Sequence, residues 1–218
     1  MSTAEKQSLD ESEEVKKAIR ELQGVTAWIQ QATHGMELPA DRRARMAFGC
    51  LDLAIEHQAG IAVLVGQPYW GAAFALVRPL LDAFVRGLWL ARAASDADLD
   101  LFERDGLRSK SFGDLVRESE KALGHELGAL SKLKDSSWGI LSDFTHTGFQ
   151  HVVRRNSATH TGPNYPETEK LQVLKLATAL GLVATVEFAA LSGHESVAQA
   201  AKQLAERFGT AYEDTSGD

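Results

Sequence analysis

The sequence predicts an all-α protein, an antiparallel bundle of about six or seven helices. Apolar residues recur every three or four positions over most of the 218 residues, and no stretch alternates apolar and polar residues as a half-buried strand does. The predicted helices are long and their connections short, which favours antiparallel neighbours. With 44% hydrophobic residues and a length that suits one domain, the chain can bury a core of its own.

The first two helices follow from apolar spacing and from the residues that break it. An amphipathic pattern over about 10–33 predicts the first helix, which Gly35 ends. Pro39 suits the first turn of a second helix, which continues to about Val65. A turn near Gln67 then folds the chain into a helical hairpin.

The stretch over about 69–94 is apolar nearly all round, which is typical of a central helix. Beyond it, Ser95 or Asp96 can cap a short helix that ends near Gly106, and Ser111 can open another in a capping box. The other helices are predicted over about 137–154, 167–191 and 195–208, with a polar loop at 156–166.

The net charge of −7 comes from the two ends of the chain. Residues 1–14 carry a net −4 and residues 211–218 a net −3, whereas residues 15–210 carry 22 acidic and 22 basic side chains. We expect disordered acidic tails at 1–10 and 210–218 around a single bundle domain at 11–209. A neutral body excludes a broad basic groove for nucleic acid but leaves room for a small phosphate site.

The N-terminus is acidic and polar, so we expect no signal peptide. The most apolar stretch, 71–91, contains two arginines and an aspartate, each of which is costly in lipid. We therefore expect a cytoplasmic protein with no membrane partner. The single cysteine, Cys50, excludes a disulfide framework, and a small buried hydrophobe is its expected role.

Arg78, Asp82 and Arg86 are spaced four residues apart, which places them on one stripe of the central helix. If the hairpin folds back near residue 67, Glu56 faces Arg78. One interpretation is a buried ion network of these four residues that fixes the register of the helices. The other is a polar pocket in which a guanidinium stays free to bind a phosphate or carboxylate.

Pro79 lies inside the same helix. Its missing N–H leaves the carbonyl of Ala75 without a helical partner, and we expect a kink there.

Three of the seven histidines fall between residues 142 and 160. Asp143 and His146 are three apart, a spacing that allows a shared metal, a carboxylate-oriented general base, or a histidine that only hydrogen-bonds within the bundle. The chain has no Glu-x-x-His pair, which excludes a di-iron bundle. We expect no metal and no cofactor.

Arg155-Asn156-x3-His160 is a further candidate site. An arginine followed by a polar residue, with histidine five positions on, resembles the signature of the HEPN ribonuclease superfamily. The resemblance implies an all-α bundle whose arginine and histidine, usually from two protomers, activate a ribose 2′-hydroxyl for metal-free RNA cleavage. Arg155 would stabilise the phosphate beside Asn156, His160 would act as base or acid, and His146 with Arg78 would line the pocket.

A second resemblance rests on two segments. An Arg-Pro-x-x-Asp-x-x-x-Arg helix at 78–86 is followed by a Ser-x-Phe-x-His-x-Gly element at 142–148. The pair resembles a group of bacterial all-helical families of unknown function, over about residues 40–190. It implies that Arg78, Asp82, Arg86 and His146 are shared polar positions, and it brings no established activity.

The sequence thus predicts a HEPN-like RNA-cleaving or nucleotide-binding protein of a bacterial toxin or defence type. We expect a homodimer, with RNA or a nucleotide and an antitoxin-like protein as partners. The alternative is a non-catalytic helical bundle that binds a ligand or another protein and in which the arginine stripe is structural. Convergence of Arg155 and His160 in one cleft would favour the first hypothesis.

Overall fold

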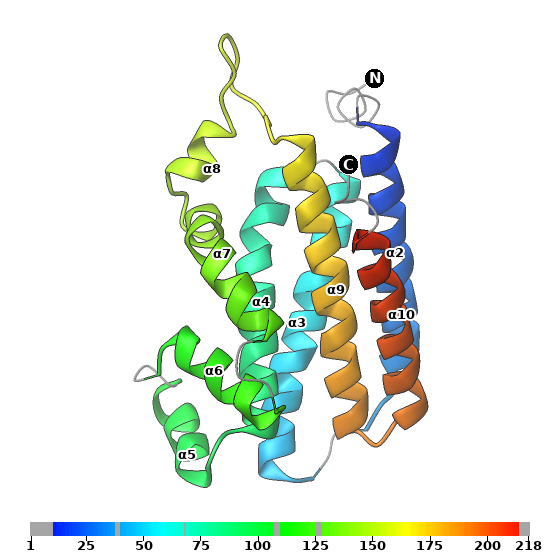
Figure 1. The fold of residues 1–218 in the computed structure, drawn as a ribbon, viewed down its shortest axis with the longest axis vertical. Coiled ribbons are helices and arrows are strands. Elements are labelled where there is room, and N and C mark those ends of the chain that lie inside the picture. Colours follow the sequence, from blue (N-terminus) through cyan, green and yellow to red (C-terminus); the bar gives the residue numbers. More distant parts are fainter. Residues whose placement is uncertain (1–10, 38–39, 68, 107–109, 125–127, 214–218) are drawn as a thin grey trace.

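The fold is all-α, as predicted. The computed structural model describes residues 11–37, 40–67, 69–106, 110–124 and 128–213, and within these ranges nine helices and no strand are present (Figure 1). The only β-type pairing there is an isolated antiparallel bridge between Asn156 and Thr161. The helices are α2 Glu13–Thr33, α3 Arg42–Gly66, α4 Trp70–Arg92, α5 Asp96–Asp105, α6 Phe112–Ala122, α7 Ala129–Thr145, α8 Phe149–Val153, α9 Glu167–Leu191 and α10 Glu195–Glu213.

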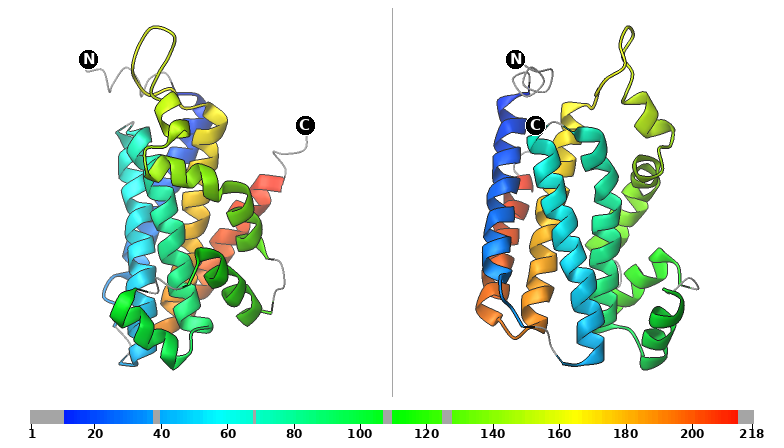
Figure 2. Two further views of the ribbon diagram at one scale, coloured as in Figure 1. Left: turned by 90° about the vertical axis from the view of Figure 1, so that its left-hand side faces the viewer. Right: turned by 180° about the vertical axis from the view of Figure 1, so that it is seen from behind.

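Five long helices form the bundle, and four shorter ones cover one side of it (Figures 1 and 2). The α3–α4 hairpin packs against α9, and α2 and α10 flank α9 on the side away from α4. The shorter helices α5 to α8 lie along the opposite side, where α6 and α7 pack on α4. α4 is therefore central, and Trp70, Phe74 and Trp89 on it are almost fully buried.

Most helix ends lie where the sequence places them. Ser95 and Ser111 both form capping boxes, with Asp98 and Asp114 respectively, and α9 has the predicted bounds. α3 begins at Arg42 because the Asp41 carboxylate accepts a hydrogen bond from the N–H of Ala44; Pro39 lies outside the described residues. α10 continues to Glu213, into residues predicted as tail, and residues 1–10 also lie outside the described ranges.

The helix predicted over 137–154 is instead two helices, α7 and α8. The chain turns between them at Thr147, whose φ of 57° is left-handed. The Asp143 carboxylate accepts the N–H of Gln150 at 3.1 Å and so caps α8. At its other end α7 starts at Ala129, earlier than predicted, because Glu120 of α6 supplies the cap that Gly128 lacks.

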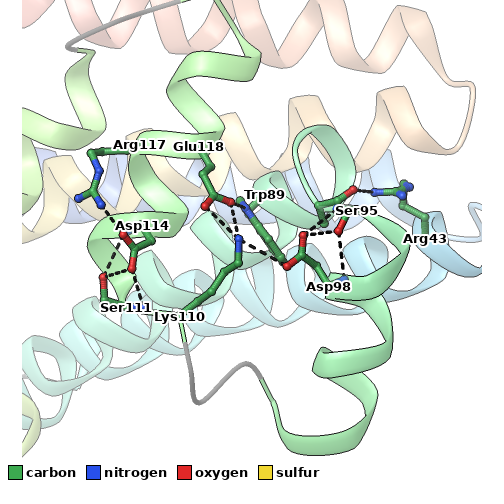
Figure 3. Close-up of polar contacts among 10 residues, drawn as sticks. Arg43, Trp89, Ser95, Asp98, Lys110, Ser111, Asp114, Arg117 and Glu118 are labelled. Carbon is green, nitrogen blue, oxygen red and sulfur yellow. Dashed lines mark hydrogen bonds and ion pairs between the residues drawn. The ribbon is translucent and has the colours of Figure 1, made fainter.

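A charged cluster fastens the shorter helices to α4 (Figure 3). Lys110 lies 2.7 Å from Glu118 on α6 and 3.5 Å from Asp98 on α5, and its Nζ sits 4.8 Å above the Trp89 ring. The indole Nε1 of Trp89 donates to the same Glu118 carboxylate at 2.6 Å. Each charge in the cluster thus has a partner, which indicates a structural joint.

Within the described part of the chain, α3 and α9 are long and apolar enough to cross a membrane by length and composition. In the bundle, 44% and 61% of their most apolar stretches are buried. Burial against neighbouring helices is also what the core helices of a globular bundle show.

Candidate functional site

A cavity of about 790 Å³ lies where α4 begins, beneath α8 and the loop that follows it. Its wall combines the start of α4, the α7–α8 turn, α8 and the 155–163 loop (Figure 1). The polar and aromatic side chains on it are Gln67, Tyr69, Thr147, His151, Arg155, Asn156 and Thr161. The volume falls in the range of small-molecule sites, and these side chains offer a cation, an imidazole, two amides and an exposed aromatic ring.

Arg155 and Asn156, both predicted as site residues, lie on this wall. The loop that carries them is folded back as a short hairpin: Asn156 bridges to Thr161, and the N–H of Gly162 donates to the carbonyl oxygen of Arg155 at 2.8 Å. The preceding Arg154 forms an ion pair with Glu169 of α9 and lies 5.3 Å from the Phe144 ring centroid. Arg154 therefore fastens the loop to the bundle, while Arg155 is left on the cavity wall.

His151 lines the cavity, although no functional role was predicted for it from the sequence. Its Nδ1 lies 2.7 Å from the carbonyl oxygen of Phe144. A carbonyl oxygen only accepts, so Nδ1 carries the hydrogen and the neutral ring has its lone pair at Nε2. The sequence did contain one indication of this position. His151 and Arg155 are four residues apart, about one helical turn, a spacing that places both side chains on the same side of a helix.

His160 does not line the cavity. It is exposed on the hairpin, where its Nδ1 lies 2.7 Å from Thr159 Oγ1 and its N–H donates to Ser157 Oγ at 3.0 Å. The structure thus brings Arg155 and Asn156 to the cavity and leaves the imidazole of His160 outside its wall within one protomer.

His146 is exposed at the C-terminal end of α7, outside the cavity wall. The carboxylate of Asp143 caps α8 and does not orient this imidazole, so that interpretation of the pair is wrong. No group of three or more metal-ligating side chains occurs among the described residues.

The predicted buried ion network is wrong in two respects. Glu56 is exposed on α3 and does not face Arg78, and the stripe on α4 is only half-buried. It faces α7, where Arg78 Nη1 donates to Ser142 Oγ at 2.6 Å and the guanidinium lies 4.3 Å above the Trp138 ring. Asp82 and Arg86 pair with each other at 3.2 Å. Arg78 therefore joins α4 to α7, while Asp82 and Arg86 form a pair within α4.

Pro79 contributes to the same joint. The carbonyl oxygen of Ala75, which has no helical N–H partner because of the proline, accepts a hydrogen bond from Thr145 Oγ1 of α7 at 3.2 Å. A side chain from the neighbouring helix thus satisfies the group that Pro79 frees.

Two other features offer less chemistry. A groove of about 860 Å³ between α2, α9 and α10 has an apolar floor that includes Val25, Trp28, Leu174 and Phe208. Cys50 is largely buried, and burial raises the pKa of its thiol to about 11, so it stays protonated near neutral pH and is a poor nucleophile.

A sequence comparison places the chain among known families. The DUF6988 family, described as a family of unknown function, matches residues 51–214. The chain belongs to the DUF6988 family. This confirms the expectation of a family without an assigned function. Among curated proteins and among solved structures, the searches found no match.

The DUF6988 match includes every residue of the cavity wall, which spans positions 67 to 163. α2 and the first turns of α3 lie outside it. The residues that match the DUF6988 family therefore include the whole cavity wall. Of the three helices that form the apolar groove, they include only α9 and α10.

Proposed function

We propose that the protein binds RNA or a nucleotide at the cavity between α4 and α8 and cleaves RNA without a metal, as a HEPN-like protein of a bacterial toxin or defence type. The observation that carries the proposal is the shared wall of Arg155, Asn156 and His151. A guanidinium and an imidazole with a free ring nitrogen are the groups that phosphate-ester chemistry requires.

The reaction would proceed by transfer within the ribose. An imidazole takes the proton of the 2′-hydroxyl, the 2′-oxygen bonds to the adjacent phosphorus, and the bond from phosphorus to the 5′-oxygen breaks. The leaving oxygen takes a proton from a second acid, so the products are a 2′,3′-cyclic phosphate and a 5′-hydroxyl end. Arg155 would stabilise the negative charge that builds up on the phosphate oxygens.

We propose a cytoplasmic homodimer, in which a second protomer presents His160 to the cavity. Support comes from α8 beside the cavity, where Phe149 is 73% exposed and Val152 and Val153 are partly exposed. Apolar side chains grouped on a surface helix are typical of protein contact sites. An antitoxin-like protein that covered this face would block access to the cavity.

The test is incubation of the purified protein with single-stranded RNA of mixed sequence in EDTA. We expect cleavage by the wild type, and cleavage by Arg155→Ala that is slower by about a hundredfold or more, because the transition state loses its cationic partner. Arg155 is exposed, so this substitution should leave the thermal midpoint unchanged.

Arg45→Ala, which removes another exposed arginine in the first turn of α3, at the other end of that helix from the turn into α4, is the matched control and should cut at the wild-type rate. His151→Asn keeps a donor for the Phe144 carbonyl but removes Nε2, and comparison with His160→Ala identifies the imidazole that acts as base. Equal cleavage by wild type and Arg155→Ala, or no cleavage by wild type, would contradict the proposal.

A second candidate is the non-catalytic ligand-binding or protein-interaction bundle. It is favoured by the α4 stripe, in which Arg78 bonds to Ser142 and Asp82 to Arg86, as expected of a stripe with a structural role. Nucleotide binding without RNA cleavage would support this candidate over the first.

A further inference from the structure

The start of α4 forms one end of the cavity. α4 is 23 residues long, its N-cap residue Tyr69 makes no side-chain capping hydrogen bond, and its residues Gly71 and Ala72 line the cavity. The first N–H groups of a helix need partners from outside it, and the helix dipole favours a negative charge at this end. The start of a long helix on a cavity wall is therefore a place where an anion is stabilised.

Gly71 lets two polar groups approach the start of α4 closely. A Cβ atom at this position would lie 3.0 Å from the Tyr165 hydroxyl oxygen and 3.3 Å from His151 Nε2. Any side chain at residue 71 would therefore crowd both groups. Because residue 71 is glycine, both groups lie close to the backbone of the helix start.

Tyr165 provides an observation that does not depend on the helix. Its side chain is 6% exposed, and within the described part of the chain its hydroxyl makes no hydrogen bond of ordinary geometry, although the Arg155 guanidinium lies beside it. A buried hydroxyl without a partner costs stability, so such groups are rare unless a ligand completes them. Burial raises the pKa of Tyr165, against the smaller opposing effect of Arg155 and Arg154 nearby, so the phenol keeps its proton and can donate it.

We propose that these groups form a binding site for a terminal phosphate, the phosphomonoester of a nucleotide or of an RNA end. The start of α4, the Tyr165 hydroxyl and the Arg155 guanidinium would donate to the phosphate oxygens, and His151 Nε2 would accept the proton of a monoanion. Donors from these several directions leave one oxygen for the ester bond, which favours a terminal phosphate over an internal diester.

The base would stack on Tyr69, which is 60% exposed and lines the same cavity. The choice of a nucleotide as ligand rests on the proposed function. The new inference is that the protein recognises the terminal phosphate of the nucleotide, and that these residues bind it.

The test is calorimetric titration of the full-length protein with adenosine monophosphate, inorganic phosphate and adenosine in metal-free buffer. We expect both phosphate compounds to bind and adenosine to bind at least about tenfold more weakly. Gly71→Ala should weaken the binding of adenosine monophosphate by about tenfold or more, because the new methyl group would push the Tyr165 hydroxyl and His151 Nε2 away from the helix start.

Gly49→Ala is the matched control, since a Cβ there meets nothing within 4 Å, and it should bind as wild type. Tyr165→Phe removes one oxygen that makes no hydrogen bond of ordinary geometry to any described residue. It should therefore keep the thermal midpoint and still bind phosphate more weakly, a combination that a purely structural tyrosine would not give.

Unchanged affinity for adenosine monophosphate in both Gly71→Ala and Tyr165→Phe would overturn this site while the proposed function stands. Phosphate binding that both variants weaken, in a protein that does not cut RNA, would support the site and overturn cleavage. Absence of binding by any phosphate compound would overturn the site.

Discussion

Gly87→Val is expected to destabilise the protein by about 3 kcal/mol, because α3 and α4 approach each other closely where this glycine lacks a side chain. A Cβ at residue 87 would lie 2.7 Å from Leu51 Cγ and 3.2 Å from the carbonyl oxygen of Ala47. Leu51 is fully buried, so it has no free space into which to move. The hairpin helices would have to separate, and urea denaturation followed by circular dichroism measures the loss.

Two variants show whether close packing is the cause. Gly49→Ala places a methyl group in open space on α3 and should be neutral or stabilising, by up to about 1 kcal/mol, because alanine favours helix more than glycine does. In a Leu51→Ala background, Gly87→Val should cost less than it does alone, since the clash partner is gone. Full additivity of the two substitutions would show that the contact with Leu51 is not responsible.

Glu120→Gln is expected to destabilise the protein by about 2–3 kcal/mol at neutral pH. Glu120 is 3% exposed, and its carboxylate accepts hydrogen bonds from the N–H of Ser131 at 3.0 Å and from Ser131 Oγ at 2.5 Å. It caps α7 from the neighbouring helix α6. An amide cannot accept all of these bonds, and its own N–H group would face other donors.

The same carboxylate predicts a pH dependence. Burial by itself raises the pKa of Glu120, but the hydrogen bonds from Ser131 and from the backbone at the start of α7 outweigh it, so the folded-state pKa is lowered. The stabilisation is therefore present above the unfolded-state pKa of about 4.3 and is lost as the pH falls through the folded-state pKa.

The difference in unfolding free energy between wild type and Glu120→Gln should thus shrink from pH 7 to strongly acidic pH. Glu56→Gln, at an exposed carboxylate, should change stability by less than about 0.5 kcal/mol at either pH. A constant difference between wild type and Glu120→Gln across this range would contradict the role of the charge.

The long helices were predictable because the information that defines them is local. Apolar spacing marked α9 over its observed bounds, a capping side chain at Ser95 or Asp96 marked the start of α5, and a capping box at Ser111 marked that of α6. The freed carbonyl of Ala75 also followed from the position of Pro79 alone.

The errors concern partners that are distant in the sequence. The cap of α7 comes from Glu120 on another helix, so no signal at residues 128–131 marked the start. The orientation of α4 toward α7 likewise depends on how the shorter helices pack, and this turned Arg78 to Ser142 and away from Glu56. His151 lies on the cavity wall because the chain turns at Thr147. The apolar spacing predicted one continuous helix through this point and so gave no sign of the turn.

Titration of the isotope-labelled, full-length protein with adenosine monophosphate in EDTA, followed by the amide resonances, tests most directly whether the cavity at the start of α4 binds a nucleotide. Shifts are predicted at Gly71 and Ala72, at His151 and at Arg155 and Asn156, which line the cavity. The resonances of α2 and α10 should stay in place. Shifts confined to the groove between α2, α9 and α10, or no shifts at all, would contradict a nucleotide site in this cavity.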